Sequence, residues 1–118
     1  MGIFKIEGGT PLKGEITPQG AKNEALQILC AVLLTEEKVK INNIPDIIDI
    51  NKLITLLGNL GVKIHRNEPG SITFQADEVN VGYLETEAFK KEGGALRGSI
   101  MIVGPLLARF GKGYIPKP

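Results

Sequence analysis

Lys22 and Asn23 are the two residues whose types and place in the sequence most directly suggest chemistry. They follow Pro18-Gln19-Gly20 and open a stretch, up to Leu34, in which apolar residues recur at helical spacing. A cation there is disfavoured by roughly 0.3–1 kcal/mol, because it faces the positive end of the helix dipole. Glycine, however, lets a backbone approach a ligand closely, and the first helical amides are unpaired. With the Lys22 ammonium and the Asn23 amide, these amides make an anion site suited to phosphate or carboxylate.

Arg97 repeats this arrangement near the start of a later apolar segment, after Gly93 and Gly94. Two cationic helix starts in one short chain favour a ligand with several negative charges. Neither stretch is a Walker loop or a Rossmann glycine motif. The simpler alternative for Lys22 is a solvated lysine whose charge is partly offset by Glu24.

Cys30 and His65 are weaker candidates for chemistry. Cys30 lies among apolar residues in mid-helix, where a cysteine is a small buried hydrophobe rather than a nucleophile. His65 shares the polar face of an alternating strand with Lys63, and a single histidine makes no metal site. We therefore expect neither a metal nor a cofactor. We also expect a solvated face at the charged residues Lys90 and Lys91 with Glu85, Glu87 and Glu92.

Composition narrows the class of protein. Of the 118 residues, 42% are hydrophobic and 23% charged, the net charge is +1, and 5% are aromatic. A near-neutral charge with few aromatic residues argues against a nucleic-acid partner. The single cysteine indicates a reducing compartment, and the sequence shows neither an apolar leader nor a stretch long enough to span a bilayer. We expect a cytoplasmic protein without a membrane partner.

Helices and strands should alternate along the chain. The first half should contain two short strands at 3–6 and 14–17, a helix at 23–34, a strand at 38–42 and a helix capped by Asp49 and ended by Gly61. A hairpin of 62–66 with 71–76 and a short charged helix at 85–91 should follow. After Gly93 and Gly94 we expect an apolar helix toward Phe110, kinked at Pro105 and ended by Gly111, and then a strand from Tyr114. This order is α/β of a mixed kind and lacks the regular alternation of a doubly wound sheet.

Parts of the sequence also match one another. Gly20-Ala21 corresponds to Gly94-Ala95, the apolar pattern of 26–33 to that of 100–107, and Ile41 to Ile115. The match predicts one complete repeat and the opening of a second.

Three longer segments, IEGGTPLKGEI, QGAKNEAL and LRGSIMIVGPLLARFGKGYIPKP, carry a resemblance that covers essentially the whole chain. The sequence resembles the enolpyruvyl transferases, and among them the UDP-N-acetylglucosamine 1-carboxyvinyltransferases of peptidoglycan synthesis. The resemblance implies an inside-out α/β barrel of βαβαββ repeats in two globular domains. Residues 1–21 would be strands of the second globular domain, and residues 22–118 an incomplete first, catalytic domain.

The resemblance also implies a reaction. The enolpyruvyl group of phosphoenolpyruvate passes to the 3-hydroxyl of UDP-N-acetylglucosamine through a tetrahedral intermediate, and phosphate leaves. Lys22 and Asn23 would bind phosphoenolpyruvate, and Arg97 would bind UDP-N-acetylglucosamine. Gly98 and Met101 stand where some members carry other residues. The family's nucleophilic cysteine would follow Pro118, so we expect an inactive N-terminal fragment that self-associates.

Two other functions stay open from the sequence. The 3-phosphoshikimate 1-carboxyvinyltransferases share the fold and the reaction type but use another acceptor, and the GAKNEAL and GPLLARFGKG segments argue against them. A small α/β binding module without catalysis, for RNA for example, is disfavoured by the neutral charge. The transferase function would belong to cell-wall synthesis, and through it to cell shape and division.

Overall fold

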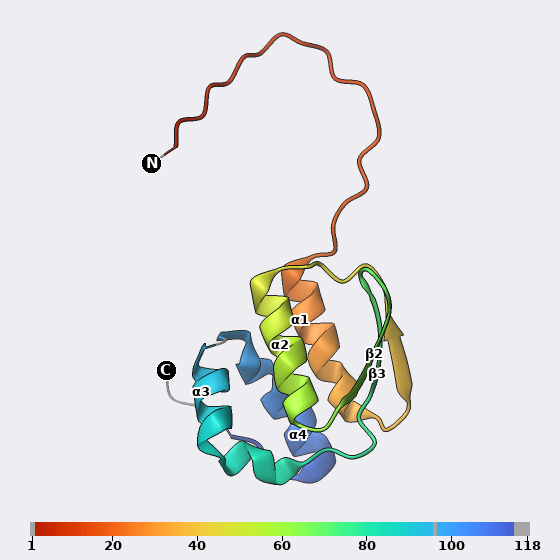
Figure 1. Ribbon diagram of the computed structural model, residues 1–118, viewed down its shortest axis with the longest axis vertical. Helices are drawn as coiled ribbons and strands as arrows, with labels where there is room; N and C mark the ends of the chain where they lie inside the picture. The colour runs from red at the N-terminus through yellow and green to blue at the C-terminus, as the bar shows by residue number, and fades with distance from the viewer. Residues whose placement is uncertain (1, 96, 115–118) are drawn as a thin grey trace.

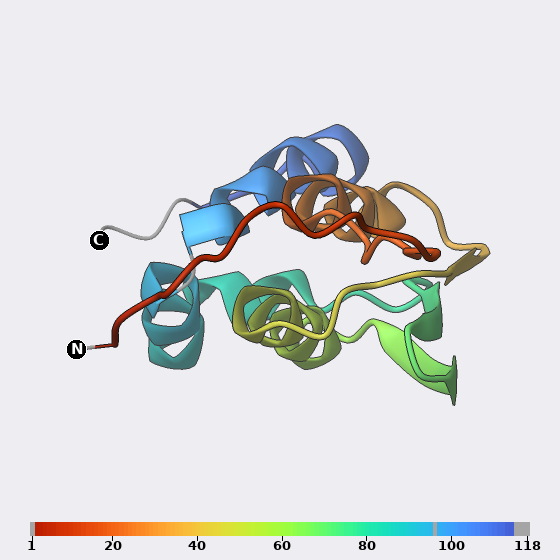
Figure 2. The same ribbon diagram turned by 90° about the horizontal axis from the view of Figure 1, so that it is seen from above.

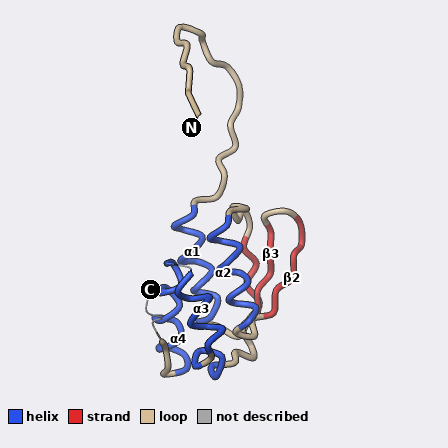
Figure 3. Tube along the Cα trace, turned by 60° about the vertical axis from the view of Figure 1, so that its left-hand side comes forward, coloured by secondary structure: helices blue, strands red, loops and turns tan. Residues whose placement is uncertain are grey.

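The computed structural model describes residues 2–95 and 97–114. Its elements are the helices α1 (Lys22–Ala31), α2 (Ile48–Asn59), α3 (Glu87–Ala95) and α4 (Val103–Phe110), the 3-10 segments η1 (Val32–Leu34), η2 (Val81–Glu85) and η3 (Arg97–Ile102), and the strands β1 (Lys38–Ile41), β2 (Lys63–Glu68) and β3 (Ser71–Gln75). The strands lie beside α1 and α2, and α3 lies on the side of these helices away from the sheet (Figure 1 and Figure 3). Figure 2 shows two helical layers, α1 with α4 and α2 with α3.

The sheet is antiparallel, in the order β1-β3-β2. Phe74 on the central strand is fully buried and lies opposite both Val39 and Ile64, so an apolar row crosses the face that packs on the helices. Thr73 points to the other face, where His65 lies opposite it and is exposed. The hairpin and the alternation expected from the sequence are confirmed.

The core forms between the helices and this face of the sheet, and between the helices themselves. Its largest fully buried side chains include Leu29, Leu33, Ile50, Leu53, Leu57, Phe74, Phe89 and Leu106. Gly61 and Gly111 end α2 and α4 with φ of +102° and +73°, as predicted. At Gly61 a Cβ atom would lie 2.4 Å from the Glu78 carbonyl oxygen, so the close approach of the next loop also requires glycine there.

The prediction of two N-terminal strands at 3–6 and 14–17 is wrong for this structure. Residues 2–20 contain neither helix nor strand and extend away from the folded body (Figure 1). A strand needs a hydrogen-bonded neighbour, and none of the three strands of the sheet pairs with residues 2–20. The large apolar side chains of this arm are 89–96% exposed: Ile3, Phe4, Ile6, Leu12 and Ile16.

Several helix boundaries also differ from expectation. Ile47, not Asp49, is the N-cap of α2, and Asp49 lies in the first turn. Helix α3 runs through the two glycines at 93–94 that were expected to precede a new helix. Pro105 lies in the first turn of α4, where its missing N–H would have no helical partner, and the change of structure comes earlier, as a 3-10 segment. Tyr114 is not in a strand, and Ile115, on which the repeat also depended, lies outside the described residues.

Candidate functional site

The start of α1 presents the expected cation and amide together. Lys22 is the first residue of the helix and Asn23 follows on the same turn, both exposed to solvent. Ala21, at the N-cap position, has no side-chain acceptor for the first helical N–H groups. These backbone donors, the ammonium and the amide therefore lie on one turn, and such a turn can bind an anion.

Gly20 seats this turn against the loop after β1. A Cβ atom at Gly20 would lie 1.9 Å from the Asn43 carbonyl oxygen and 3.1 Å from Cδ of Pro45. The loop is held in place, because the N–H of Ile44 donates to the Gly70 carbonyl at 2.9 Å. Glycine is thus required here for packing, a role that the sequence does not reveal. The ligand approach expected of it stays a prediction.

Lys22 pairs with Asp49 of the neighbouring helix. Its Nζ atom lies 2.6 Å from Oδ2 of Asp49, and the two side chains are 49% and 41% exposed. The hydrogen bond from Lys22, and then its charge, hold the pKa of the Asp49 carboxyl below its usual range. The sequence suggested Glu24 as the offsetting acid, since a contact between two helices leaves no trace in local spacing. The cation at the start of α1 is instead balanced by an acid in the first turn of α2, where the helix dipole favours a carboxylate.

Arg97, the third expected site residue, has a side chain that lies outside the described residues. Its backbone begins η3, and η3 packs against α1. The structure therefore brings this segment to the helix that carries Lys22 and Asn23. Whether the guanidinium joins them is a prediction.

Cys30 and His65 behave as the sequence indicated. The Cys30 side chain is 2% exposed, and burial raises the pKa of its thiol to about 12. Such a thiol is protonated at neutral pH and is not a nucleophile. His65 lies exposed on the outer face of the sheet.

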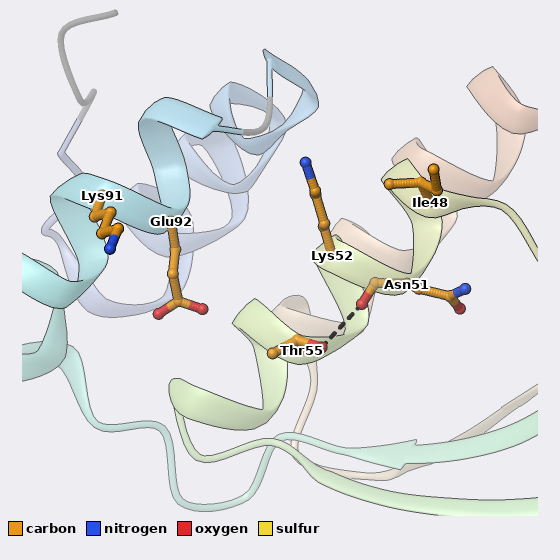
Figure 4. Close-up of a pocket in the computed structure, with 6 residues that line it drawn as sticks. All are labelled: Ile48, Asn51, Lys52, Thr55, Lys91 and Glu92. Carbon is orange, nitrogen blue, oxygen red and sulfur yellow. Dashed lines mark hydrogen bonds between the residues drawn. The ribbon is translucent and has the colours of Figure 1, made fainter.

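A cavity of about 480 Å³ lies between α2 and α3, lined by Ile48, Asn51, Lys52, Thr55, Lys91 and Glu92 (Figure 4). The Thr55 hydroxyl donates to the Asn51 carbonyl oxygen at 3.0 Å. Glu92 accepts hydrogen bonds from the Asn59 amide, at 2.8 Å, and from the Tyr83 hydroxyl. The Glu92 carboxylate therefore joins α3 to α2, and the expectation that it belongs to a solvated face is wrong.

Arg109 is a residue whose importance sequence reasoning missed. Its Nη1 donates to the carbonyl oxygens of Leu33, at 3.0 Å, and Thr35, at 3.1 Å. The guanidinium also lies 4.8 Å from the centroid of the Phe110 ring. One side chain of α4 thus satisfies backbone acceptors at the end of η1 and fixes α4 to η1. An arginine in the last turn of an apolar helix was the only available signal.

Among the described residues, no helix is long and apolar enough to cross a bilayer. Within the same ranges, no three side chains of His, Cys, Asp or Glu are placed to hold a metal ion.

Residues 6–116 match the family model of EPSP synthase (3-phosphoshikimate 1-carboxyvinyltransferase). The chain belongs to the EPSP synthase family. Over all 118 residues it is 55% identical to a protein of Porphyromonas gingivalis, 54% to one of Bacteroides fragilis and 45% to one of Citrobacter koseri, each named UDP-N-acetylglucosamine 1-carboxyvinyltransferase. The chain spans 27% of the length of these relatives.

A solved structure from the same group of enzymes supports the membership in the EPSP synthase family. The enolpyruvyl transferase NikO from Streptomyces tendae superimposes with a TM-score of 0.68 at 25% identity, over 88% of this chain and 23% of that one. The resemblance to the enolpyruvyl transferases is confirmed, and so is a mixed α/β fold, here with an open three-stranded sheet.

Proposed function

We propose that these residues supply the phosphoenolpyruvate-binding part of a UDP-N-acetylglucosamine 1-carboxyvinyltransferase, which catalyses the first committed step of peptidoglycan synthesis. The observation that carries the proposal is the start of α1, where Lys22, Asn23 and free helical N–H groups lie on one turn. The relatives at 45–55% identity support UDP-N-acetylglucosamine as the acceptor. Phosphoenolpyruvate has a carboxylate and a phosphate, the groups that such a turn binds.

The reaction is an addition followed by an elimination. The 3-hydroxyl of the sugar loses its proton as its oxygen adds to C2 of phosphoenolpyruvate, C3 gains a proton, and a tetrahedral intermediate forms. Phosphate then leaves C2 as C3 loses a proton, which restores the double bond in the product. The Lys22 ammonium and the first N–H groups of α1 stabilise negative charge on the phosphate, and Asn23 orients the substrate. In this proposal Arg97 binds the nucleotide sugar, a role supported by the packing of η3, which begins at Arg97, on α1.

We propose that Cys30 takes no part in this reaction. Cys30 cannot supply a reactive thiol, because it is buried and its pKa is raised to about 12. We propose that residues 1–21 and 22–118 belong to different domains of an inside-out barrel. The extended, apolar arm of residues 2–20 supports this division. We also propose a cytoplasmic location, since the single cysteine, Cys30, is a buried free thiol, as suits a reducing compartment.

A chimera tests the proposal directly. These 118 residues replace the matching segment of the Porphyromonas gingivalis relative, which is 55% identical over that segment. The control chimera carries the corresponding segment of a 3-phosphoshikimate 1-carboxyvinyltransferase. We expect release of phosphate from phosphoenolpyruvate, dependent on UDP-N-acetylglucosamine, only in the first chimera. A folded first chimera without activity, or equal activity in the control, would contradict the proposal.

A further inference from the structure

The ion pair between Lys22 and Asp49 joins the first turns of two packed helices. The 2.6 Å separation of Nζ and Oδ2 is that of a charge-assisted hydrogen bond, and α1 packs against α2. A lysine side chain is a flexible four-carbon stem, so a fixed acceptor restricts where its charge can be. The partner of Lys22 therefore decides where the site's positive charge lies.

We propose that Asp49 is a positioning residue for Lys22, which holds the ammonium at the start of α1 and shares it with the anionic substrate. The inference rests on the function proposed above. An ammonium has three N–H donors, and the half-exposed Lys22 can give one to Asp49 and present others to a bound phosphate or carboxylate.

Asp49 is suited to this role because it is itself held in place. It lies in the first turn of α2, where the dipole stabilises its charge. The Asn51 amide donates to Oδ1 of Asp46 at 2.8 Å, which fixes the chain just before that turn. The hydrogen bond from Lys22 keeps the pKa of Asp49 low, so the carboxylate stays ionised at neutral pH.

Removal of the Asp49 charge has two opposed consequences for an anionic substrate. The site becomes more positive, which favours binding of phosphoenolpyruvate. The ammonium, however, is no longer held where charge develops in the transition state, which lowers the rate of the chemical step. A positioning role therefore predicts a lower kcat without a higher KM for phosphoenolpyruvate. A purely structural role predicts a lower melting temperature and unchanged kinetics of the folded enzyme.

The test uses the chimera defined above with Asp49→Asn, Asp49→Glu and the control Asp46→Asn. Asp46→Asn removes a carboxylate close to the same turn but can still accept the hydrogen bond from Asn51. We expect Asp49→Asn to lower kcat by about tenfold or more, with KM for phosphoenolpyruvate unchanged or lower. Asp49→Glu should restore part of the loss, and Asp46→Asn should stay within about twofold of the parent.

A double-mutant cycle with Lys22→Gln shows whether Asp49 acts through Lys22. If it does, Asp49→Asn has no further effect on the residual turnover of Lys22→Gln; losses that multiply would overturn the inference. An unchanged kcat in Asp49→Asn, or an equal loss in Asp46→Asn, would overturn it as well. Should Asp49→Asn fail to fold, Asp49→Glu decides, since an intermediate kcat is expected and a wild-type kcat contradicts the role. A parent chimera without any activity would instead refute the proposed function.

Discussion

Replacement of Gly20 by alanine should disturb the site through packing alone. The added Cβ atom would lie 1.9 Å from a backbone oxygen, that of Asn43, whereas real Cβ atoms essentially never come within 3.0 Å of such a neighbour. The oxygen cannot move freely, because Asn43 has φ of +57° and Ile44 is hydrogen-bonded to Gly70. Either this loop or the start of α1 has to shift.

The expected cost is that of overpacking, at the upper part of its usual range. We expect Gly20→Ala to lower the free energy of unfolding by roughly 2–3 kcal/mol. For a folded body of this size, that corresponds to a fall in melting temperature of roughly 10–20 °C. Urea titration followed by circular dichroism, together with a thermal melt, measures both quantities.

Gly104→Ala is the matched control for this experiment. Gly104 lies in α4, and a Cβ atom built there has nothing within 4 Å. Alanine is the better helix former, so this variant should be unchanged or more stable by up to about 1 kcal/mol. If Gly20→Ala melts with the parent protein while Gly104→Ala behaves as expected, the close seating of α1 on the loop after β1 is wrong.

Three further predictions concern the rest of the chain. Burial raises the pKa of the Cys30 thiol to about 12, so above about pH 8.5 only the unfolded chain loses this proton, and stability should fall by about 2 kcal/mol by pH 10. Denaturant titrations between pH 8.5 and pH 10 should show that the free energy of unfolding falls less steeply with pH in Cys30→Ala than in the parent. Arg109→Met removes the donor that the carbonyls of Leu33 and Thr35 share, and it should lower the free energy of unfolding by about 1–3 kcal/mol in the same assay. A denaturation midpoint equal to that of the parent would contradict a stabilising role for these hydrogen bonds. Sedimentation should show that the 118-residue chain self-associates, because the arm exposes apolar side chains, and that deletion of residues 2–16 reduces this self-association. A monodisperse parent would refute this prediction.

The sequence predicted those elements whose apolar spacing is regular. The stripes of α1 and α2, the alternation in β1 and β3 and the glycines at 61 and 111 follow from local chemistry, and the structure contains them. The prediction of strands in the N-terminal arm was wrong because strand formation depends on a hydrogen-bonded partner elsewhere in the chain. The predicted end of α3 was wrong because two successive glycines favour a break, and the packing of the helix overrides this preference.

The site was predictable only in part. Lys22 and Asn23 could be singled out because a cation at a helix start conflicts with the dipole, and the resemblance to the enolpyruvyl transferases supplied the reaction. The Asp49 partner could not be found, since it comes from another helix and from a position expected to be a cap. The contacts of Arg109 and the clash that Gly20 avoids are likewise tertiary, and neither leaves a local pattern.

Steady-state turnover of Lys22→Gln in the chimera tests whether Lys22 serves the anionic substrate. Glutamine keeps much of the length and can still donate to Asp49, while the charge is removed. We expect turnover to fall by at least about a hundredfold, with a ligand-free melting temperature near that of the parent and unchanged affinity for UDP-N-acetylglucosamine. Near-normal turnover together with a melting temperature lowered by several degrees would mean that Lys22 is structural, and would contradict the account.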